Sequence, residues 1–126
     1  MTGTGSSEIL VAGAGPAGMI AALAFAQAGF SVTLAGPPSQ SDDRRTTALM
    51  MPSLAFLREL GLFEALIEDA APLGAMRIVD ATSRLIRSPT VMFRASEIGE
   101  DAFGYNIPNG SLLQALEAAV RERGVV

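Results

Sequence analysis

Three glycines near the N-terminus, Gly13, Gly15 and Gly18, have the spacing G-x-G-x-x-G. In such a turn the first glycine allows a tight bend, the second lets a pyrophosphate approach the backbone, and the third lets helix and strand pack closely. Pro16 and Ala17 lie between the last two glycines, where the free N–H groups of a helix start favour a phosphate without a basic side chain. These five residues predict a dinucleotide site; a purely structural glycine turn is the alternative.

The carboxylate that usually accompanies this turn is missing. About 20 residues beyond the turn, at the end of the second strand, an Asp or Glu normally binds the adenosine ribose. That position is Gly36, and the next carboxylates are Asp42 and Asp43. The ribose would then be held by backbone and water, with reduced affinity, or by an aspartate that reaches back. A 2′-phosphate is a further option, with Arg44 and Arg45 as the nearest cations.

Composition excludes most other chemistry. The 126 residues contain 13 Asp or Glu and 9 Arg, and no His, Cys, Lys or Trp. A Ser-His-Asp triad, a thiolate nucleophile, the usual zinc sites and Schiff-base chemistry are therefore absent. The net charge of −4 argues against nucleic acid as a partner, and the lack of Cys fits a cytoplasmic location. We expect any chemistry to come from a cofactor; we identify no catalytic residue and expect no metal.

The elements around the turn have the order of an α/β unit. Short apolar runs at Ile9–Ala12 and Val32–Ala35 predict two buried parallel strands, and Gly18–Ala28 is rich in strong helix formers. Glu8 is the one ionisable side chain before Asp42, as expected for strands buried on both faces. With 49 % apolar residues, the chain is expected to fold as one domain.

Further elements are expected along the rest of the chain. We expect a flexible start at 1–7, a loop at Pro37–Asp43, and helices over Thr47–Ala71 that divide at Gly61. A hairpin of Met76–Ala81 and Arg84–Ser88 should follow, with Val91–Arg94 as a third strand. The last elements are an acidic loop at Glu97–Asp101 and an amphipathic helix at Gly110–Arg123. Val125–Val126 look like the opening of another parallel strand. We therefore expect the chain to be the front part of a longer protein.

Three segments in order after the turn carry a resemblance to a known family. They are residues 43–49 (DRRTTAL), residues 52–63 (PSLAFLRELGLF), and residues 104–109 (GYNIPN) before 111–116 (SLLQAL). Together with the GAGPAG turn, they resemble the N-terminal part of the FAD-dependent aromatic hydroxylases of the para-hydroxybenzoate hydroxylase type. The subgroup they resemble most is the ubiquinone-biosynthesis hydroxylases that act on polyprenyl phenols. The resemblance runs from Ile9 to Val126.

The resemblance implies roles for individual residues. Gly13, Gly15 and Gly18 would face the FAD pyrophosphate, Arg45 would lie against the cofactor, and Asn109 would lie beside the ribityl chain. The family's ribose-binding acid corresponds to Gly36, which departs from the pattern.

Each of these roles has a structural alternative. Arg45 could pair with Asp42 or Asp43 on a surface loop, and Asn109 could cap the last helix. Thr46 and Thr47 could offer hydroxyls to the cofactor or cap the next helix.

The resemblance also implies an architecture and an activity. Residues 1–126 would be the N-terminal portion of an FAD-binding domain: a Rossmann-like βαβ unit with helices and a small antiparallel hairpin, in an incomplete doubly wound sheet. Residues 76–94 would be an antiparallel insertion belonging to the substrate-side sheet. NAD(P)H would be the electron donor and a small aromatic molecule the substrate. Peripheral membrane association of the intact enzyme and a homodimer through an exposed sheet edge are compatible with this interpretation.

Two other classes remain open at this point. One is a stand-alone NAD(P)- or nucleotide-binding Rossmann module. The other is an inactive truncated fragment, because the family's second flavin-contacting segment and most of its substrate domain are missing from these 126 residues.

Overall fold

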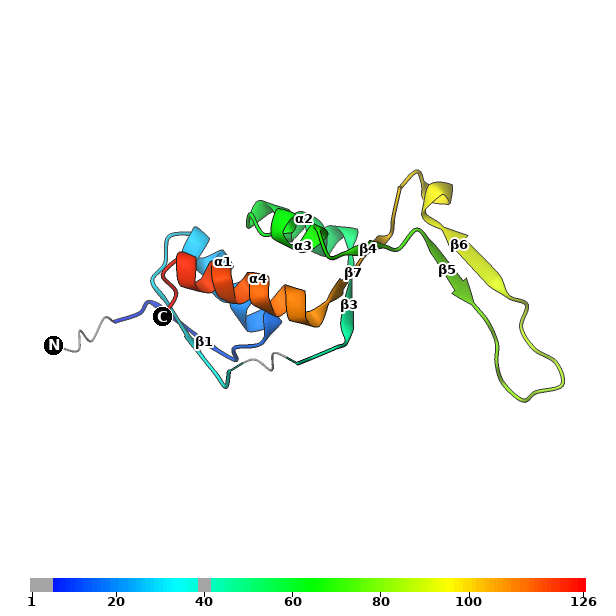
Figure 1. The fold of residues 1–126 in the computed structure, drawn as a ribbon, viewed down its shortest axis with the longest axis horizontal. Coiled ribbons are helices and arrows are strands. Elements are labelled where there is room, and N and C mark those ends of the chain that lie inside the picture. The colour runs from blue at the N-terminus through cyan, green and yellow to red at the C-terminus, as the bar shows by residue number, and fades with distance from the viewer. Residues whose placement is uncertain (1–5, 39–41) are drawn as a thin grey trace.

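The computed structural model describes residues 6–38 and 42–126. Its elements are β1 (Ile9–Ala12), α1 (Pro16–Gln27), β2 (Val32–Ala35), β3 (Thr46–Met50), α2 (Met51–Glu59), α3 (Phe63–Ile67), β4 (Ala71–Pro72), β5 (Ala75–Ile78), β6 (Val91–Arg94), the short 3-10 helix η1 (Ala95–Ile98), β7 (Gly104–Pro108) and α4 (Asn109–Glu122). The four α-helices gather in one body, from which β5 and β6 project as an arm (Figure 1).

The predicted βαβ unit is confirmed in its order and pairing. The expected burial of both strands is wrong for β1, in which Leu10 is 67 % exposed, because the described sheet contains only β1 and β2. β1 and β2 pair in parallel, from Ile9 opposite Val32 to Ala12 opposite Ala35, and α1 connects them. The helix begins at Pro16, two residues before the expected start, because proline suits the first helical position, where no N–H is needed. The glycine turn therefore leads directly from a strand into a helix, as a phosphate-binding turn requires.

The core lies between the helices. α1 buries Met19, Ala22 and Leu23, and α4 buries its predicted apolar face. The core cluster contains Met19, Leu23, Leu54, Leu57, Leu60, Leu62, Leu66, Ile107, Leu112, Leu113, Leu116 and Ala119. This packing fixes the N-terminal ends of α1 and α4 in one rigid body, and these ends carry the candidate site.

The expected helix from Thr47 is wrong at its start. Residues 46–50 form β3, which pairs antiparallel with β7 from Thr46 opposite Pro108 to Met50 opposite Gly104. The β-branched Thr46 and Thr47 favour a strand, and Pro52 lies in the first turn of α2, so that helix begins only at Met51. β4 then adds to the other edge of β7.

The expected hairpin is wrong in its pairing. β5 pairs with β6, so Met76 lies opposite Phe93 and Ile78 opposite Val91, while residues 84–88 are not in a strand. Cross-strand apolar pairs account for this choice of partner. The expected acidic loop is also partly helical, because η1 includes Glu97, whose side chain accepts the N–H of Arg94 at 3.1 Å.

The backbone of Val126 lies against β2. Its N–H donates to the carbonyl of Val32 at 3.2 Å, and its own carbonyl accepts the N–H of Leu34 at 2.7 Å. This is the hydrogen-bond pattern of a parallel ladder, as expected for residues 125–126, although they form no strand of their own. Part of the expected flexible start (1–5) and of the expected loop (39–41) lies outside the described residues. In the described ranges, no helix is long and apolar enough to cross a bilayer.

Candidate functional site

Two of the three turn glycines are required by the fold itself. Gly13 has a φ of 118°, which favours glycine, and its N–H donates to the carbonyl of Ala35 at 2.7 Å. A Cβ on Gly18 would lie 1.7 Å from the carbonyl oxygen of Gly13. Gly18 therefore allows the close contact of helix and strand that the spacing predicts.

Gly15 is different, because no contact within residues 6–38 and 42–126 requires a glycine there. Its φ of −78° and ψ of −179° are open to any residue. A Cβ built on Gly15 would meet no atom within 4 Å. Among the described residues, the backbone at Gly15 thus borders open space, where a ligand could approach it.

The N-terminus of α1 has no side-chain cap. Gly15 is the N-cap residue, Pro16 follows it, and the first turn contains no acidic residue. The first backbone hydrogen bond of the helix runs from the N–H of Met19 to the carbonyl of Gly15 at 2.9 Å. The N–H groups of Ala17 and Gly18 therefore have no acceptor within the helix, and they can donate to a phosphate.

Gly36, at the position of the missing acid, packs directly on the turn. A Cβ on Gly36 would lie 2.4 Å from the N atom of Ala14 and 2.9 Å from its Cβ. A side chain at this position would displace either β2 or the turn. The close contact between Gly36 and Ala14 therefore leaves no room for an acidic side chain at the position of the ribose-binding acid.

Arg45 pairs with Asp43, as its structural alternative predicted. Its Nε donates to Oδ1 at 2.9 Å and its Nη2 to Oδ2 at 2.8 Å, and its backbone N–H also reaches Oδ1, at 3.0 Å. The Arg45 side chain is 83 % exposed, whereas that of Asp43 is 16 % exposed. Hydrogen bonds from Arg45 and from Asn109 hold the pKa of Asp43 well below its usual range, so the carboxylate is charged at neutral pH.

Asn109 joins the same carboxylate and caps no helix. Its Nδ2 donates to Oδ2 of Asp43 at 2.9 Å, and its Oδ1 accepts the hydroxyl of Thr47 at 2.5 Å. Its backbone N–H donates to the carbonyl of Arg45 at 2.9 Å. Because α4 has no side-chain cap and Thr46 and Thr47 lie in a strand, the capping alternatives for all three residues are wrong.

The structure thus gathers the predicted residues into two groups. The turn residues form one group, and Arg45 and Asn109 form the other with Asp43. Among the described residues, no hydrogen bond found joins one group to the other. From the sequence, Asp43 was expected only as an alternative partner of Arg45 in place of the cofactor. The contact of Asp43 with Asn109 was not predicted. The D-x-R spacing of residues 43–45 was a local signal for the Asp43–Arg45 pair. The contact of Asp43 with Asn109 depends instead on the pairing of β3 with β7.

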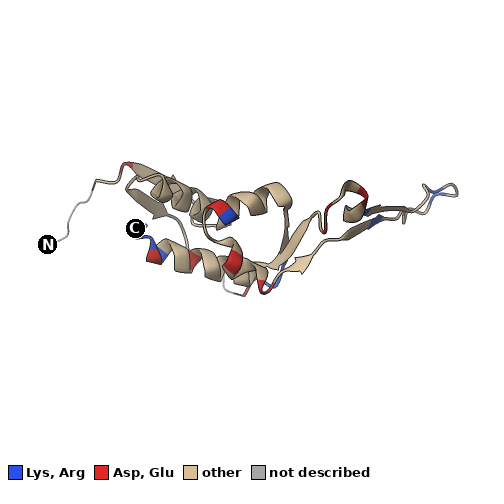
Figure 2. Ribbon diagram, turned by 90° about the horizontal axis from the view of Figure 1, so that it is seen from above, with Lys and Arg blue, Asp and Glu red and all other residues tan. Residues whose placement is uncertain are grey.

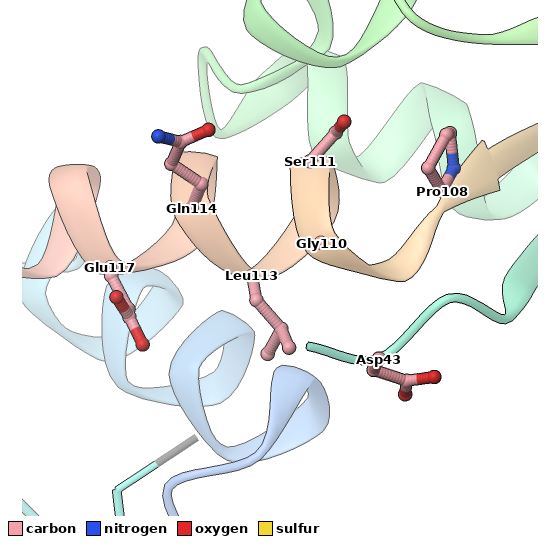
Figure 3. Close-up of a pocket in the computed structure, with 7 residues that line it drawn as sticks. All are labelled: Asp43, Pro108, Gly110, Ser111, Leu113, Gln114 and Glu117. Carbon is pink, nitrogen blue, oxygen red and sulfur yellow. The ribbon is translucent and has the colours of Figure 1, made fainter. Parts of the chain in front are cut away.

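A cleft of about 490 Å³ lies beside the second group. It is lined by Asp43, Pro108, Gly110, Ser111, Leu113, Gln114 and Glu117, and Figure 3 shows the segment of Asp43 facing the first turns of α4 across it. A larger and mostly apolar groove of about 700 Å³ runs between α1 and α2, with Ala17 and Leu49 in its wall. Both volumes are in the range of small-molecule sites.

The βαβ unit, the bare backbone at Gly15 and the uncapped helix define the Rossmann-like class of α/β nucleotide-binding domain. A family model described as FAD binding domain matches residues 6–125. The chain therefore belongs to this family of FAD-binding domains.

Relatives of known or assigned activity are flavoproteins. A protein of Bacillus subtilis (strain 168) named as an FAD-dependent monooxygenase, YetM, is 46 % identical over 60 residues, which are 45 % of this chain and 16 % of that protein. The structure of a flavoprotein/dehydrogenase from Cytophaga hutchinsonii matches with a TM-score of 0.72 at 21 % identity, over 94 % of this chain and 29 % of the other.

A second solved structure, p-nitrophenol 4-monooxygenase PnpA from Pseudomonas putida DLL-E4, matches with a TM-score of 0.67 at 20 % identity. It covers 90 % of this chain and 28 % of the other. The chain thus spans less than a third of the length of these structures and corresponds to their FAD-binding fold. These matches do not support the ubiquinone-biosynthesis subgroup.

Proposed function

We propose that this chain is the FAD-binding N-terminal portion of an NAD(P)H-dependent flavin monooxygenase that hydroxylates an aromatic substrate. The observation that carries the proposal is Gly15, whose lack of a side chain the fold does not require. The open space beside its backbone and the free N–H groups of Ala17 and Gly18 fit a pyrophosphate.

Arg45 and Asn109 would bind the middle of the cofactor. Asp43 engages Nε and Nη2 of Arg45, whereas Nη1 makes no hydrogen bond found in the described part of the chain. This exposed nitrogen can donate to a phosphate or ribityl oxygen, while the ion pair fixes the plane of the guanidinium. Asn109, held by Asp43 and Thr47, would present its remaining N–H close to Arg45.

The bound FAD would supply the redox chemistry, with NAD(P)H as the electron source and oxygen as the co-substrate. This chain contributes binding and orientation, because none of its described side chains is placed as a catalytic acid or base.

The arm of β5 and β6 would belong to a substrate-side sheet. One face of this two-stranded arm is wholly apolar, with Met76 opposite Phe93 and Ile78 opposite Val91, and all four are at least 41 % exposed. A two-stranded ribbon is marginally stable alone, so further strands that cover this face would complete a sheet. Such strands would come from a longer protein of the length of the relatives.

An aromatic substrate is supported by the p-nitrophenol 4-monooxygenase among the similar structures and by the ordered motifs at 43–49 and 104–109. A polyprenyl phenol as the substrate rests on the sequence resemblance alone.

Calorimetric titration of the purified chain with FAD, and separately with NADPH, tests the proposal. We expect FAD to bind with saturation, and more tightly than NADPH. Tighter binding of NADPH would favour a stand-alone nucleotide module. Binding of neither, together with a dimer in sedimentation velocity, would indicate a fragment that pairs through a sheet edge. Both results would contradict the proposal.

A further inference from the structure

The loop between β5 and β6 presents two aliphatic side chains to solvent. Residues 79–90 form the far end of the arm, remote from the helical body (Figure 1). Leu85 is fully exposed and Ile86 is 86 % exposed, the two highest exposures among the large apolar residues of the described chain. Adjacent exposed aliphatic side chains at a protruding tip form an apolar patch, and such patches mark contact sites for a protein or a membrane.

The base of this loop is closed by one carboxylate. Asp80 accepts the N–H of Thr82 at 3.0 Å through Oδ1 and the N–H of Ser88 at 2.9 Å through Oδ2. These hydrogen bonds lower the pKa of Asp80, so the closure persists at neutral pH. Leu85 and Ile86 lie between the two anchored residues and are therefore presented by a defined loop.

Positive charge surrounds the apolar pair. Arg84 and Arg87 flank it directly in the sequence R-L-I-R. Residues 75–94 contain four of the nine arginines and one of the 13 acidic residues, so five arginines and twelve acidic residues lie elsewhere. In Figure 2 the arm and its tip carry arginines, whereas most acidic residues lie on the body and at the base of the arm, and the body also carries arginines.

We propose that this tip docks on an anionic lipid surface, with Leu85 and Ile86 in the acyl boundary and Arg84 and Arg87 on lipid phosphates. Apolar insertion combined with basic residues is the chemistry of reversible interfacial binding, and charge complementarity selects an anionic membrane. Two side chains are too small for a protein interface, which buries about 800 Å² on each partner. The acidic body would face away from the lipid.

Co-sedimentation of the 126-residue chain with phosphatidylcholine vesicles, with and without phosphatidylserine, tests this inference. We expect binding to the anionic vesicles that weakens with added salt, because the arginine contribution is screened. The double variant Leu85→Ser/Ile86→Ser should lower the partition coefficient about a hundredfold, since each buried aliphatic side chain contributes a factor of about ten. Arg84→Gln/Arg87→Gln should lower binding to anionic vesicles specifically.

Matched variants elsewhere provide the control. Ile98→Ser removes an aliphatic side chain that is 67 % exposed at the base of the arm, and Arg121→Gln removes an exposed arginine of α4. Both should bind as the unaltered chain does, and circular dichroism checks that every variant is folded. No binding to anionic vesicles, or binding that survives the Leu85/Ile86 change, would overturn the inference. A dimer dissociated by that change, without vesicle binding, would also overturn it and assign the tip to self-association.

Discussion

Asn109 donates its Nδ2–H to Oδ2 of Asp43 at 2.9 Å, across 66 residues of sequence. The same carboxylate binds the guanidinium of Arg45 in a bidentate pair. One acidic side chain therefore holds both of the residues outside the glycine turn that the sequence resemblance assigns to the cofactor. It also ties the segment after β2 to the start of α4.

Replacement of Asp43 by Asn should weaken FAD binding. The amide cannot pair with Arg45 as an ion, so the guanidinium would lose its fixed orientation. Because the pair is largely exposed on the Arg45 side, we expect a loss of about threefold to fivefold in affinity, measured by calorimetry. Asp42→Asn, at the exposed neighbour, is the matched control and should bind as before. Unchanged affinity in Asp43→Asn would refute a positioning role.

The same ion pair predicts a dependence of stability on pH. Folding lowers the pKa of Asp43 below the ordinary 3.8, so the charged carboxylate stabilises the folded state. The contribution is fully present above pH 3.8 and is lost as the pH falls below that value toward the lowered pKa. The difference in free energy of unfolding between the unaltered chain and Asp43→Asn should stay constant from neutral pH downward and shrink only in this acid range. A difference that shrinks near neutral pH would contradict the assignment.

Restoring an acid at Gly36 should fail to restore a ribose contact. Any Cβ there would lie 2.4 Å from the N atom of Ala14, so Gly36→Glu would displace the turn that we propose as the pyrophosphate site. We expect Gly36→Glu and Gly36→Ala to bind FAD more weakly than the unaltered chain, and to similar extents. Tighter binding by Gly36→Glu in the same titration would show that the side chain is accommodated and that the missing acid alone limits affinity.

Gly18 should be required for folding. A Cβ at this position would lie 1.7 Å from the carbonyl oxygen of Gly13, which is backbone and cannot turn aside. We expect Gly18→Ala to lower the free energy of unfolding by about 1–3 kcal/mol, the range typical of overpacking. Urea denaturation measures this loss. A midpoint equal to that of the unaltered chain would contradict the close contact.

Local signals in the sequence were sufficient for the βαβ unit. The apolar runs, the glycine spacing and Pro16 lie within one short stretch, so strand, turn and helix could be predicted from neighbours in the chain. The buried face of α4 followed from its helical period in the same way.

The sequence predictions were wrong where the structure depends on pairing between strands that are distant in the sequence. Thr47 to Met50 can continue a helical pattern, and only the ladder with residues 104–107 makes them a strand. Ile78 could pair with a near or a distant partner, and the distant Val91 supplies the apolar match. The contact of Asp43 with Asn109 depends on the same β3–β7 pairing. Sequence spacing therefore suggested each residue, but not the network that connects them.

The central claim is that the backbone at Gly15 is bare because a pyrophosphate lies against it. An NMR titration of the ¹⁵N-labelled chain with FAD tests it most directly, and Gly15→Ala is the matched variant because its Cβ meets no atom within 4 Å. We expect the amide signals of residues 13–15, 17 and 18 to shift with FAD. We also expect Gly15→Ala to lose these shifts while its free energy of unfolding changes by less than about 1 kcal/mol. Equal FAD shifts in both proteins, or shifts confined to other parts of the chain, would contradict it.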